Sequence, residues 1–343
     1  MGGDLKRFLV LISKIVISVA LVGFFLNRIE WGEIETAFSS ASPLFWMLAV
    51  FLFLSSNLLG ALQWGELLRI QNIRLSVRKV VGLYFVGVFF NNFLVSNIGG
   101  DAVRIYDLKR LTGQGLAGFA ATFLDRFIGL FTLICFSIVA YTFSPGLRGT
   151  SLWMPILLLA VILLAVLLFG FSRRMSNFVV SLAGRVLPSR LVEFLENVRA
   201  GFLLYRHAYG MIVRVSLLAT GVQLSRIGVD YAVGHALGQN VPFAYYVVFI
   251  PLIAIVAAIP VSFGGIGVRE NMGVLLFGRV GMGDASALAV MFLGYLAGIV
   301  ASLAGGILFV IRRSSSGVVE QEFSDEGGEC PWHISTRQVM RSG

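Results

Sequence analysis

Charged residues are scarce in this sequence. Of its 343 residues, 13% are charged and 57% are hydrophobic, whereas soluble domains have about 25% charged and roughly 45–50% apolar residues. The 27 basic and 18 acidic side chains are too few to cover the surface of a soluble fold of this length. The composition therefore excludes an ordinary soluble globular protein.

Cysteine and histidine are also rare. Two cysteines and three scattered histidines form neither a disulfide framework nor a metal cluster. The sequence contains no P-loop, no HExxH and no Gly-x-Ser-x-Gly elbow. We therefore expect no metal, no cofactor and no catalytic residue, and we predict that the chain is not an enzyme. The net charge of +9 does not indicate nucleic acid, because the basic residues lie between apolar runs, where they set topology and meet anionic headgroups.

Long apolar runs dominate what is present. About 20 apolar residues span a bilayer, and six runs are long enough: residues 8–26, 44–63, 116–143, 152–171, 210–231 and 285–311. Two further stretches, residues 80–98 and 243–263, are each followed directly by a Gly-Gly pair. Barrel strands would instead alternate apolar and polar residues. The pattern predicts an all-α polytopic membrane protein with about eight hydrophobic units.

The two Gly-Gly segments repeat one pattern. Each reads Val-Ser, then Gly-Gly-x-x-Val-Arg, and the two glycine pairs begin 165 residues apart, at Gly99 and Gly264. The neighbouring spans follow the same offset, which predicts two halves, about residues 5–143 and 150–313. If each Gly-Gly hairpin re-enters on one face, each half crosses three times, and the second half is inverted relative to the first.

Charge placement favours the same topology. The loop at residues 27–43 is acidic and should lie outside, whereas residues 64–79 and 172–207 are rich in arginine and should lie inside. Six full crossings plus two re-entrant hairpins satisfy these constraints and place both termini in the cytoplasm. Eight crossings would put Lys109 and Arg110 outside. The polar, Gly/Ser-rich residues 314–343 are expected to form a disordered cytoplasmic tail.

The hairpins are the first candidate site. A helix that starts just after Gly-Gly would point its free N–H groups and its positive dipole end into the membrane interior, and an arginine follows within about one turn. Such a pair of hairpins would bind an anion such as phosphate, although glycines can also serve close helix packing. The candidate binding residues are Gly99, Gly100, Asp101, Arg104, Gly264, Gly265, Gly267, Arg269 and Glu270.

Polar residues within the spans are the second candidate set. A charged side chain at mid-membrane costs roughly 2.5–3.5 kcal/mol, so these residues should face the bundle interior. They would line or gate a pathway, or form structural ion pairs. The residues are Asn91, Asn92, Asp125, Arg126, Gln223, Arg226 and Asp230.

These segments resemble a known family, the lysylphosphatidylglycerol synthase transmembrane region, also called the flippase-like domain family. The resemblance rests on residues 91–104 (NNFLVSNIGGDAVR), on Asp125-Arg126 and on residues 260–270 (PVSFGGIGVRE), and it covers about residues 5–313. Two positions depart from the pattern. Val95 stands where proline is frequent, and Gly294-Tyr295 stands where a charged residue is common.

The resemblance implies a flippase-like transmembrane domain over residues 1–313. Fused members move aminoacylated phosphatidylglycerol between leaflets and carry a separate synthase domain, which we do not expect in this chain. The expected function is movement of a phospholipid or another anionic or aminoacylated lipid between leaflets of a bacterial inner membrane. A small-solute or ion transporter and a membrane enzyme acting on a lipid-linked substrate remain alternatives. The expected partners are membrane lipids, namely anionic phospholipids, with a second copy of the chain or a lipid-synthesising enzyme as further candidates and no nucleic acid.

Overall fold

The computed structural model describes residues 39, 41–93, 99–143, 152–171, 209–258 and 265–325. Within these residues every regular element is a helix, which confirms the all-α membrane fold. The expected first span and the basic segment 172–207 lie outside the described residues. The elements are α3 (Pro43–Ile70), α4 (Val77–Phe93), α5 (Gly99–Thr112), α6 (Gly115–Phe143), α7 (Trp153–Phe171), α10 (Tyr209–Ala236), α11 (Phe243–Ala258), α12 (Val268–Phe277), the short 3-10 helix η2 (Gly278–Val280) and α13 (Asp284–Asp325).

Four of these helices are long and apolar enough to cross a membrane. They are α3, α6, α10 and the part of α13 that ends at Ile311. Residues Trp153–Val166 of α7 and Phe243–Ala257 of α11 form shorter apolar helices. The long spans carry large exposed apolar side chains along their outer faces. In a membrane these side chains contact lipid, which supports a multi-pass membrane protein.

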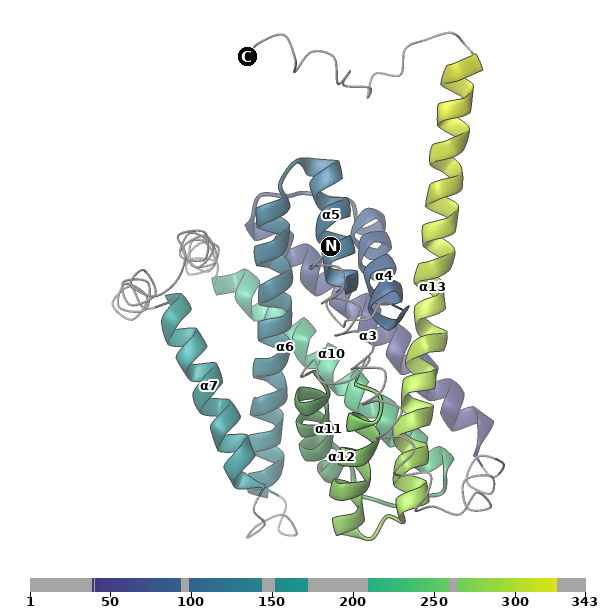
Figure 1. The fold of residues 1–343 in the computed structure, drawn as a ribbon. Helices are drawn as coiled ribbons and strands as arrows, with labels where there is room; N and C mark the ends of the chain where they lie inside the picture. Colours follow the sequence, from purple (N-terminus) through teal and green to yellow (C-terminus); the bar gives the residue numbers. More distant parts are fainter. Residues whose placement is uncertain are drawn as a thin grey trace, which may run out of the picture.

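The helices that flank the two Gly-Gly segments are short. With about 1.5 Å of rise per residue, neither the 14 residues of α5 nor the 10 residues of α12 reach across a hydrocarbon core of about 30 Å. Figure 1 shows α4 and α5 together in the upper half of the bundle, and α11 and α12 together in the lower half. This arrangement agrees with two re-entrant hairpins that enter from opposite ends.

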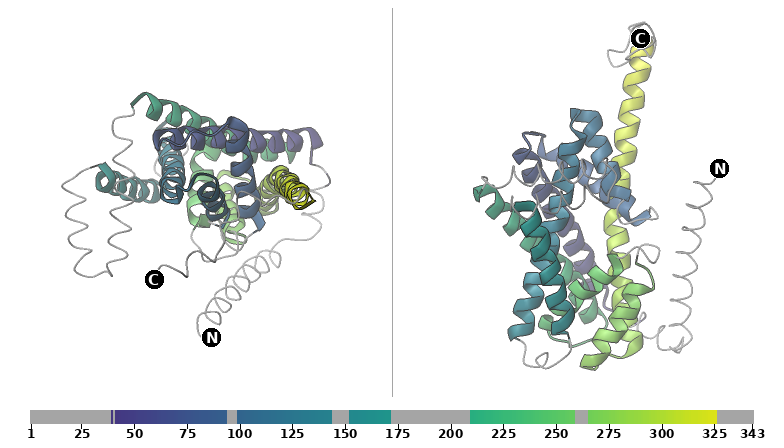
Figure 2. Two further views of the ribbon diagram at one scale, coloured as in Figure 1. Left: turned by 90° about the horizontal axis from the view of Figure 1, so that it is seen from above. Right: turned by 60° about the vertical axis from the view of Figure 1, so that its left-hand side comes forward.

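The described helices form two equivalent sets. The first set is α3, α4, α5 and α6, and the second is α10, α11, α12 and α13. The helices α3 and α10 both have 28 residues and lie side by side along one side of the bundle (Figure 2, left). The hairpins pack reciprocally, because α4 contacts α13 and α11 contacts α6. The sequence offset is therefore a structural repeat with opposite orientation of its two copies.

The buried apolar side chains form two main clusters. The larger one centres on α10, α11, α12 and α13 and also takes in side chains of α3, α6 and α7, whereas the second centres on α3, α4, α5 and α6 and includes Val215 of α10. At its end α13 continues to Asp325 and rises above the other helices (Figure 1). Residues 314–325, which the sequence led us to place in a disordered tail, are thus helical in the structure.

Candidate functional site

The helices α5 and α12 both begin inside the bundle. Figure 1 shows α5 running from the middle of the bundle up to the start of α6, and α12 running down toward the start of α13. The first turn of a helix has N–H groups without intrahelical partners and carries the positive end of the helix dipole. The two starts approach mid-depth from opposite directions, as broken helices do at transporter binding sites.

In the first hairpin the glycines serve close packing. A Cβ added to Gly100 would collide with the carbonyl oxygen of Gly87 on α4, so only glycine permits this contact between α4 and α5. The backbone N–H of Gly100 donates to the side-chain oxygen of Asn91 at 2.8 Å. This amide, expected to face an anion, is therefore capped by the protein's own side chain.

In the second hairpin the glycines make the turn itself. Gly265 and Gly267 have φ values of +80° and +84°, a region that side chains with a Cβ rarely adopt. The N–H of Gly267 donates to Glu270 Oε2 at 2.6 Å, which caps α12. Gly264 lies outside the described residues. The backbone amides of Gly100 and Gly267 are thus satisfied within the protein, and the side chains carry the charge that a ligand would meet.

Arg104, one turn into α5, is enclosed by three other helices. Its side chain is only 3% exposed, with Asp101 Oδ1 and Asp125 Oδ2 each 3.5 Å from Nη2. The guanidinium carbon lies 4.5 Å from the Trp64 ring centroid and 4.8 Å from that of Tyr84. Its Nε has no hydrogen-bond partner among the described residues. In this state Arg104 is a buried cation held by carboxylates and aromatic faces, not an open headgroup ligand.

Arg126 on α6 is the accessible cation of the same group. Its side chain is 50% exposed, and both Nε and Nη2 lie 2.9 Å from Asp101 Oδ2. Asp101 therefore bridges a buried and an accessible arginine. The position is about 16 Å from the start of α6 at 1.5 Å per residue, close to the middle of the span. A charged side chain at this depth is costly in hydrocarbon, and the carboxylate of Asp101 offsets the charge of Arg126.

A third arginine approaches from the other half. Arg226 on α10 acts electrostatically on Asp125 and Tyr84, and its Nε is buried without a hydrogen-bond partner among the described residues. The central cluster thus contains three cations and two carboxylates. We call this set the arginine cluster; its members are Asp101, Arg104, Asp125, Arg126 and Arg226.

The equivalent position in the second half is Arg269, the second residue of α12. Its Nη2 donates to the Met291 carbonyl at 2.9 Å, and the guanidinium carbon lies 4.6 Å from the Tyr295 ring centroid. Glu270 Oε1 is 3.5 Å away, and the Arg269 side chain is 26% exposed. The two halves therefore use different partners for equivalent arginines, and Arg269 is the more accessible of the two.

Asp230 on α10 faces α13 at the place where the sequence departs from the family pattern. A Cβ added to Gly294 would lie 2.5 Å from Asp230 Oδ1, so the glycine makes room for the carboxylate. Arg269 acts on Asp230 electrostatically. At these two positions the carboxylate of Asp230 occupies the space beside Gly294, and the ring of Tyr295 lies against the guanidinium of Arg269.

Two buried amides lie where α3 crosses α10. Asn57 is fully buried, and neither its Nδ2 nor its Oδ1 has a hydrogen-bond partner among the described residues. Gln223 is 6% exposed. The antiparallel register of the two helices places these residues opposite each other. The contacts that set this register are those of Gly221 with Leu59 and of Gly228 with Leu52.

Sequence reasoning missed several residues that build the site. Trp64 and Tyr84 enclose Arg104, and Trp64 also donates its indole N–H to the Thr122 hydroxyl at 3.2 Å. One signal of a further polar residue inside the bundle was present in the sequence, because Asn57 interrupts the apolar run at residues 44–63. The predicted Asn92 lies near the end of α4 with its buried Nδ2 unpartnered among the described residues. Within those residues no group of three His, Cys, Asp or Glu side chains is placed to hold a metal.

The comparisons with known proteins fit this architecture. The model of the lysylphosphatidylglycerol synthase TM region matches residues 11–306. A protein of Pyrococcus horikoshii described as UPF0104 membrane protein PH1989 is 26% identical, over 90% of this chain and 98% of its own length. A UPF0104 membrane protein of Methanothermobacter thermautotrophicus is 23% identical, over 89% of this chain and 93% of its own length. The family match extends over most of the chain and includes both Gly-Gly segments, so this multi-pass membrane protein belongs to the family of the lysylphosphatidylglycerol synthase TM region.

Proposed function

We propose that this protein moves a lipid with a phosphate-bearing headgroup between the leaflets of the membrane. The observation that carries the proposal is the arginine cluster, in which three cations face two carboxylates near mid-depth. An excess positive charge inside a membrane is costly unless an anion or water meets it. A lipid phosphate would supply that negative charge while the acyl chains of the lipid stay in the bilayer.

Arg126 and Arg226 are the residues that we propose to meet the phosphate. Arg126 is half exposed, and Arg226 adds a third positive charge to a cluster that holds two carboxylates. Arginine suits this role because its planar fork binds phosphate oxygens in pairs. Arg104, at 3% exposure, holds the cluster together from behind. In the other half, the partly exposed Arg269 offers an equivalent contact for the headgroup further along its path.

The inverted halves fit a transporter rather than an enzyme. Inverted repeats with broken helices at mid-depth are common in secondary transporters, where one half moves against the other around a fixed site. We propose that the protein acts in the cytoplasmic membrane, with both termini on the cytoplasmic side, as the distribution of basic loops indicates. The two relatives named above are archaeal, so we do not restrict this proposal to bacteria. A second copy of the chain or a lipid-synthesising enzyme is a proposed partner.

The test is lipid translocation in proteoliposomes. Purified protein is reconstituted with headgroup-labelled anionic, zwitterionic or cationic phospholipid, and the outer-leaflet accessibility of the label is followed over time. We expect protein-dependent movement of the anionic lipid, and a decrease of at least about tenfold in Arg126→Gln and Arg226→Gln. That factor corresponds to the loss of one charged hydrogen bond, about 1.5–3 kcal/mol.

Arg69→Gln is the matched control. Arg69 is also partly exposed, at 48%, and pairs with a carboxylate on Glu66 at 2.7 Å, but it lies at the end of α3, away from the cluster. The control should transport as the unchanged protein does. Unchanged transport by both Arg126→Gln and Arg226→Gln would remove the proposed site. Flux of a small anion such as inorganic phosphate, without lipid movement, would instead assign the pathway to a solute.

A further inference from the structure

Asp230 differs from the other carboxylates inside the bundle. Asp101, Asp125 and Glu270 each have an arginine nitrogen within 3.5 Å. Among the residues that the structure describes, Asp230 forms neither an ion pair nor a hydrogen bond. It lies on α10, about 9 Å before the end of that helix at Ala236. An ionised carboxylate in a membrane span is costly unless it is paired, so this position calls for a partner that the described side chains do not supply.

A buried hydroxyl group lies at the same site. Tyr246 of α11 is 1% exposed, and its hydroxyl has no hydrogen-bond partner among the described residues. This hydroxyl packs against Gly234, which follows Asp230 by one turn of α10, and Asp230 acts on it electrostatically. Gly294 of α13 leaves room for Asp230 Oδ1, which a Cβ at that position would approach to 2.5 Å. The site between α10, α11 and α13 thus holds a carboxylate and a hydroxyl, neither of which has a hydrogen-bond partner in the described part of the chain.

Arg269 of α12 is the described cation that acts on Asp230. Its guanidinium is held by other groups, because Nη2 donates to the Met291 carbonyl at 2.9 Å and the Tyr295 ring centroid lies 4.6 Å from the guanidinium carbon. A proton bound to Asp230 would therefore cancel the attraction between the two residues without breaking an ion pair or a hydrogen bond. The other titratable side chains next to the site are Tyr231 of α10, Tyr246 of α11, Glu270 of α12 and Tyr295 of α13; Glu66 and Arg69 of α3 lie at the far end of that helix, and Asp125 and Arg126 of α6 belong to the arginine cluster.

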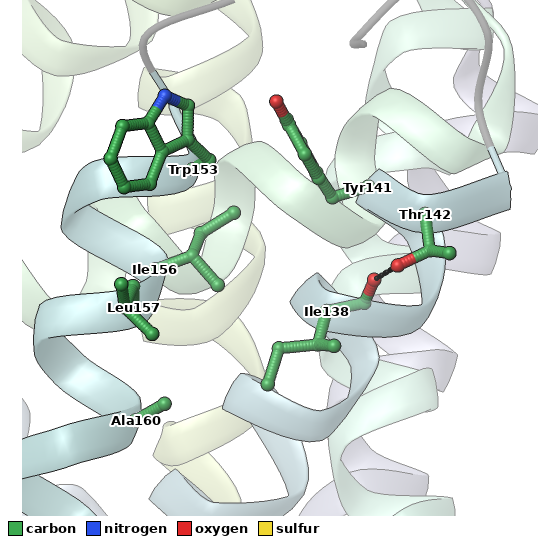
Figure 3. Close-up of a pocket in the computed structure, with 7 residues that line it drawn as sticks. All are labelled: Ile138, Tyr141, Thr142, Trp153, Ile156, Leu157 and Ala160. Atoms are coloured by element: carbon green, nitrogen blue, oxygen red, sulfur yellow. Dashed lines mark hydrogen bonds between the residues drawn. The ribbon is translucent and has the colours of Figure 1, made fainter.

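Aromatic and imidazole side chains lead from the end of α10 to Asp230. The ring centroid of Tyr231 lies 4.5 Å from that of His235 and 5.4 Å from that of Tyr246. His235 is partly buried in the last turn of α10, which is the outer end of this helix in the proposed topology. Histidine gains and loses a proton near neutral pH, and Asp, Glu and His side chains form proton relays in membrane transporters. The crevice between α6 and α7 (Figure 3) offers no such route, because none of its lining side chains is charged.

We propose that Asp230 binds a proton from the outer side of the membrane and that this protonation is coupled to lipid movement. The step forms one O–H bond on a carboxylate oxygen, with water as the source of the proton, and it removes the negative charge of the group. Arg269, no longer attracted by Asp230, then offers its charge to the lipid phosphate. Return of the proton to water on the cytoplasmic side restores the carboxylate. The proton site rests on the local geometry alone, whereas its coupling to lipid rests on the function proposed above.

Infrared difference spectroscopy of the reconstituted full-length protein tests the proton site without reference to transport. Spectra are compared between alkaline and mildly acidic buffers, in both of which an ordinary exposed carboxyl group stays ionised. We expect the carbonyl band of a protonated carboxyl group to appear in the unchanged protein and to be lost in Asp230→Asn. Asp284→Asn is the matched control and should keep the band, because Asp284 is an exposed carboxylate in the first turn of α13. Asp230→Ser replaces Asp230→Asn if that variant loses its folded, monodisperse state. Absence of the band from the unchanged protein, or an undiminished band in the Asp230 variant, would overturn the proposal.

Lipid translocation under a pH gradient tests the coupling. Proteoliposomes with labelled anionic phospholipid are assayed without a gradient and with the outside buffer more acidic than the lumen. We expect the acidic outside to raise the rate of the unchanged protein and of Asp284→Asn by about tenfold, an ordinary size for coupling between two sites, and Asp230→Asn to show the same rate in both conditions. A rate of the unchanged protein that does not respond to the gradient, or an equal response of Asp230→Asn, would overturn the coupling. If the unchanged protein moves no lipid in either condition, the proposed function fails, and the infrared band alone decides the proton site.

Discussion

The sharpest prediction concerns Arg104, because the structure gives it a stabilising role. Replacement with methionine keeps the length and apolar stem of the side chain but removes the charge. Asp125 then loses the cation 3.5 Å away, and the rings of Trp64 and Tyr84 lose the guanidinium between them. We expect Arg104→Met to lower the free energy of unfolding substantially.

The magnitude follows from the burial of the pair. With side-chain exposures of 3% for Arg104 and 10% for Asp125, solvent screens the interaction little, and removal of one partner from a buried pair costs about 3–5 kcal/mol. The double variant Arg104→Met/Asp125→Leu removes both charges. Asp101 remains neutralised in the double variant, since Arg126 lies 2.9 Å from it. We therefore expect the double variant to recover at least about 2 kcal/mol of the loss.

The assay is denaturant unfolding of the purified variants in mixed micelles, analysed as a double-mutant cycle. Arg69→Met serves as the surface control and should change stability by no more than about 1 kcal/mol. Two results would refute the reasoning: Arg104→Met as stable as Arg69→Met, or losses in the double variant that simply add. Because Arg104 supports the fold, loss of transport on its replacement is informative only beside this stability measurement.

Three further predictions use the same unfolding assay. Gly100→Ala should lower the free energy of unfolding by about 1–3 kcal/mol, because the added Cβ forces α5 away from α4. At Gly82 an added Cβ meets nothing within 4 Å, so Gly82→Ala should be neutral or stabilising by up to about 1 kcal/mol. Equal effects of the two substitutions would contradict the packing argument. Asn57→Leu should raise stability by about 1–3 kcal/mol, because it removes a buried amide that has no hydrogen-bond partner among the described residues. A loss of stability would show that the amide is satisfied. Glu66→Gln should change stability by less than about 1 kcal/mol, because Arg69 is 48% exposed; a larger loss would mean that this pair is shielded from water in the membrane.

The helices and the repeat were accessible from sequence because both depend on local patterns. An apolar run of about 20 residues has few stable alternatives to a membrane helix, and the expected spans at residues 116–143 and 152–171 end where α6 and α7 end. The Gly-Gly segments were found from their repeated letters, and the structure places short helices after both. The ends of α3 and α13 extend beyond the predicted runs, because their last turns are polar and hydropathy does not register them. Helix α10 also continues past its predicted end, to Ala236.

The repeated sequence motif does not reveal the roles of its glycines and arginines. The same motif yields a packing contact at Gly100, which sits inside α5, and a turn with positive φ at Gly265. Likewise Arg104 is enclosed at 3% exposure, whereas Arg269 remains 26% exposed. The motif is the same in both halves, but the residues that pack against it in the folded protein differ.

The sequence by itself determined that this chain is a membrane protein with two inverted halves, since those properties follow from hydropathy, charge between spans and an internal repeat. Only the tertiary structure decided which charged side chains are buried in ion pairs and which are exposed. The partners of Arg104 come from α3, α4 and α6, and a further cation that acts on Asp125, Arg226, comes from α10 in the other half. Such contacts depend on how distant helices cross, and packing geometry is not encoded at any single position of the chain.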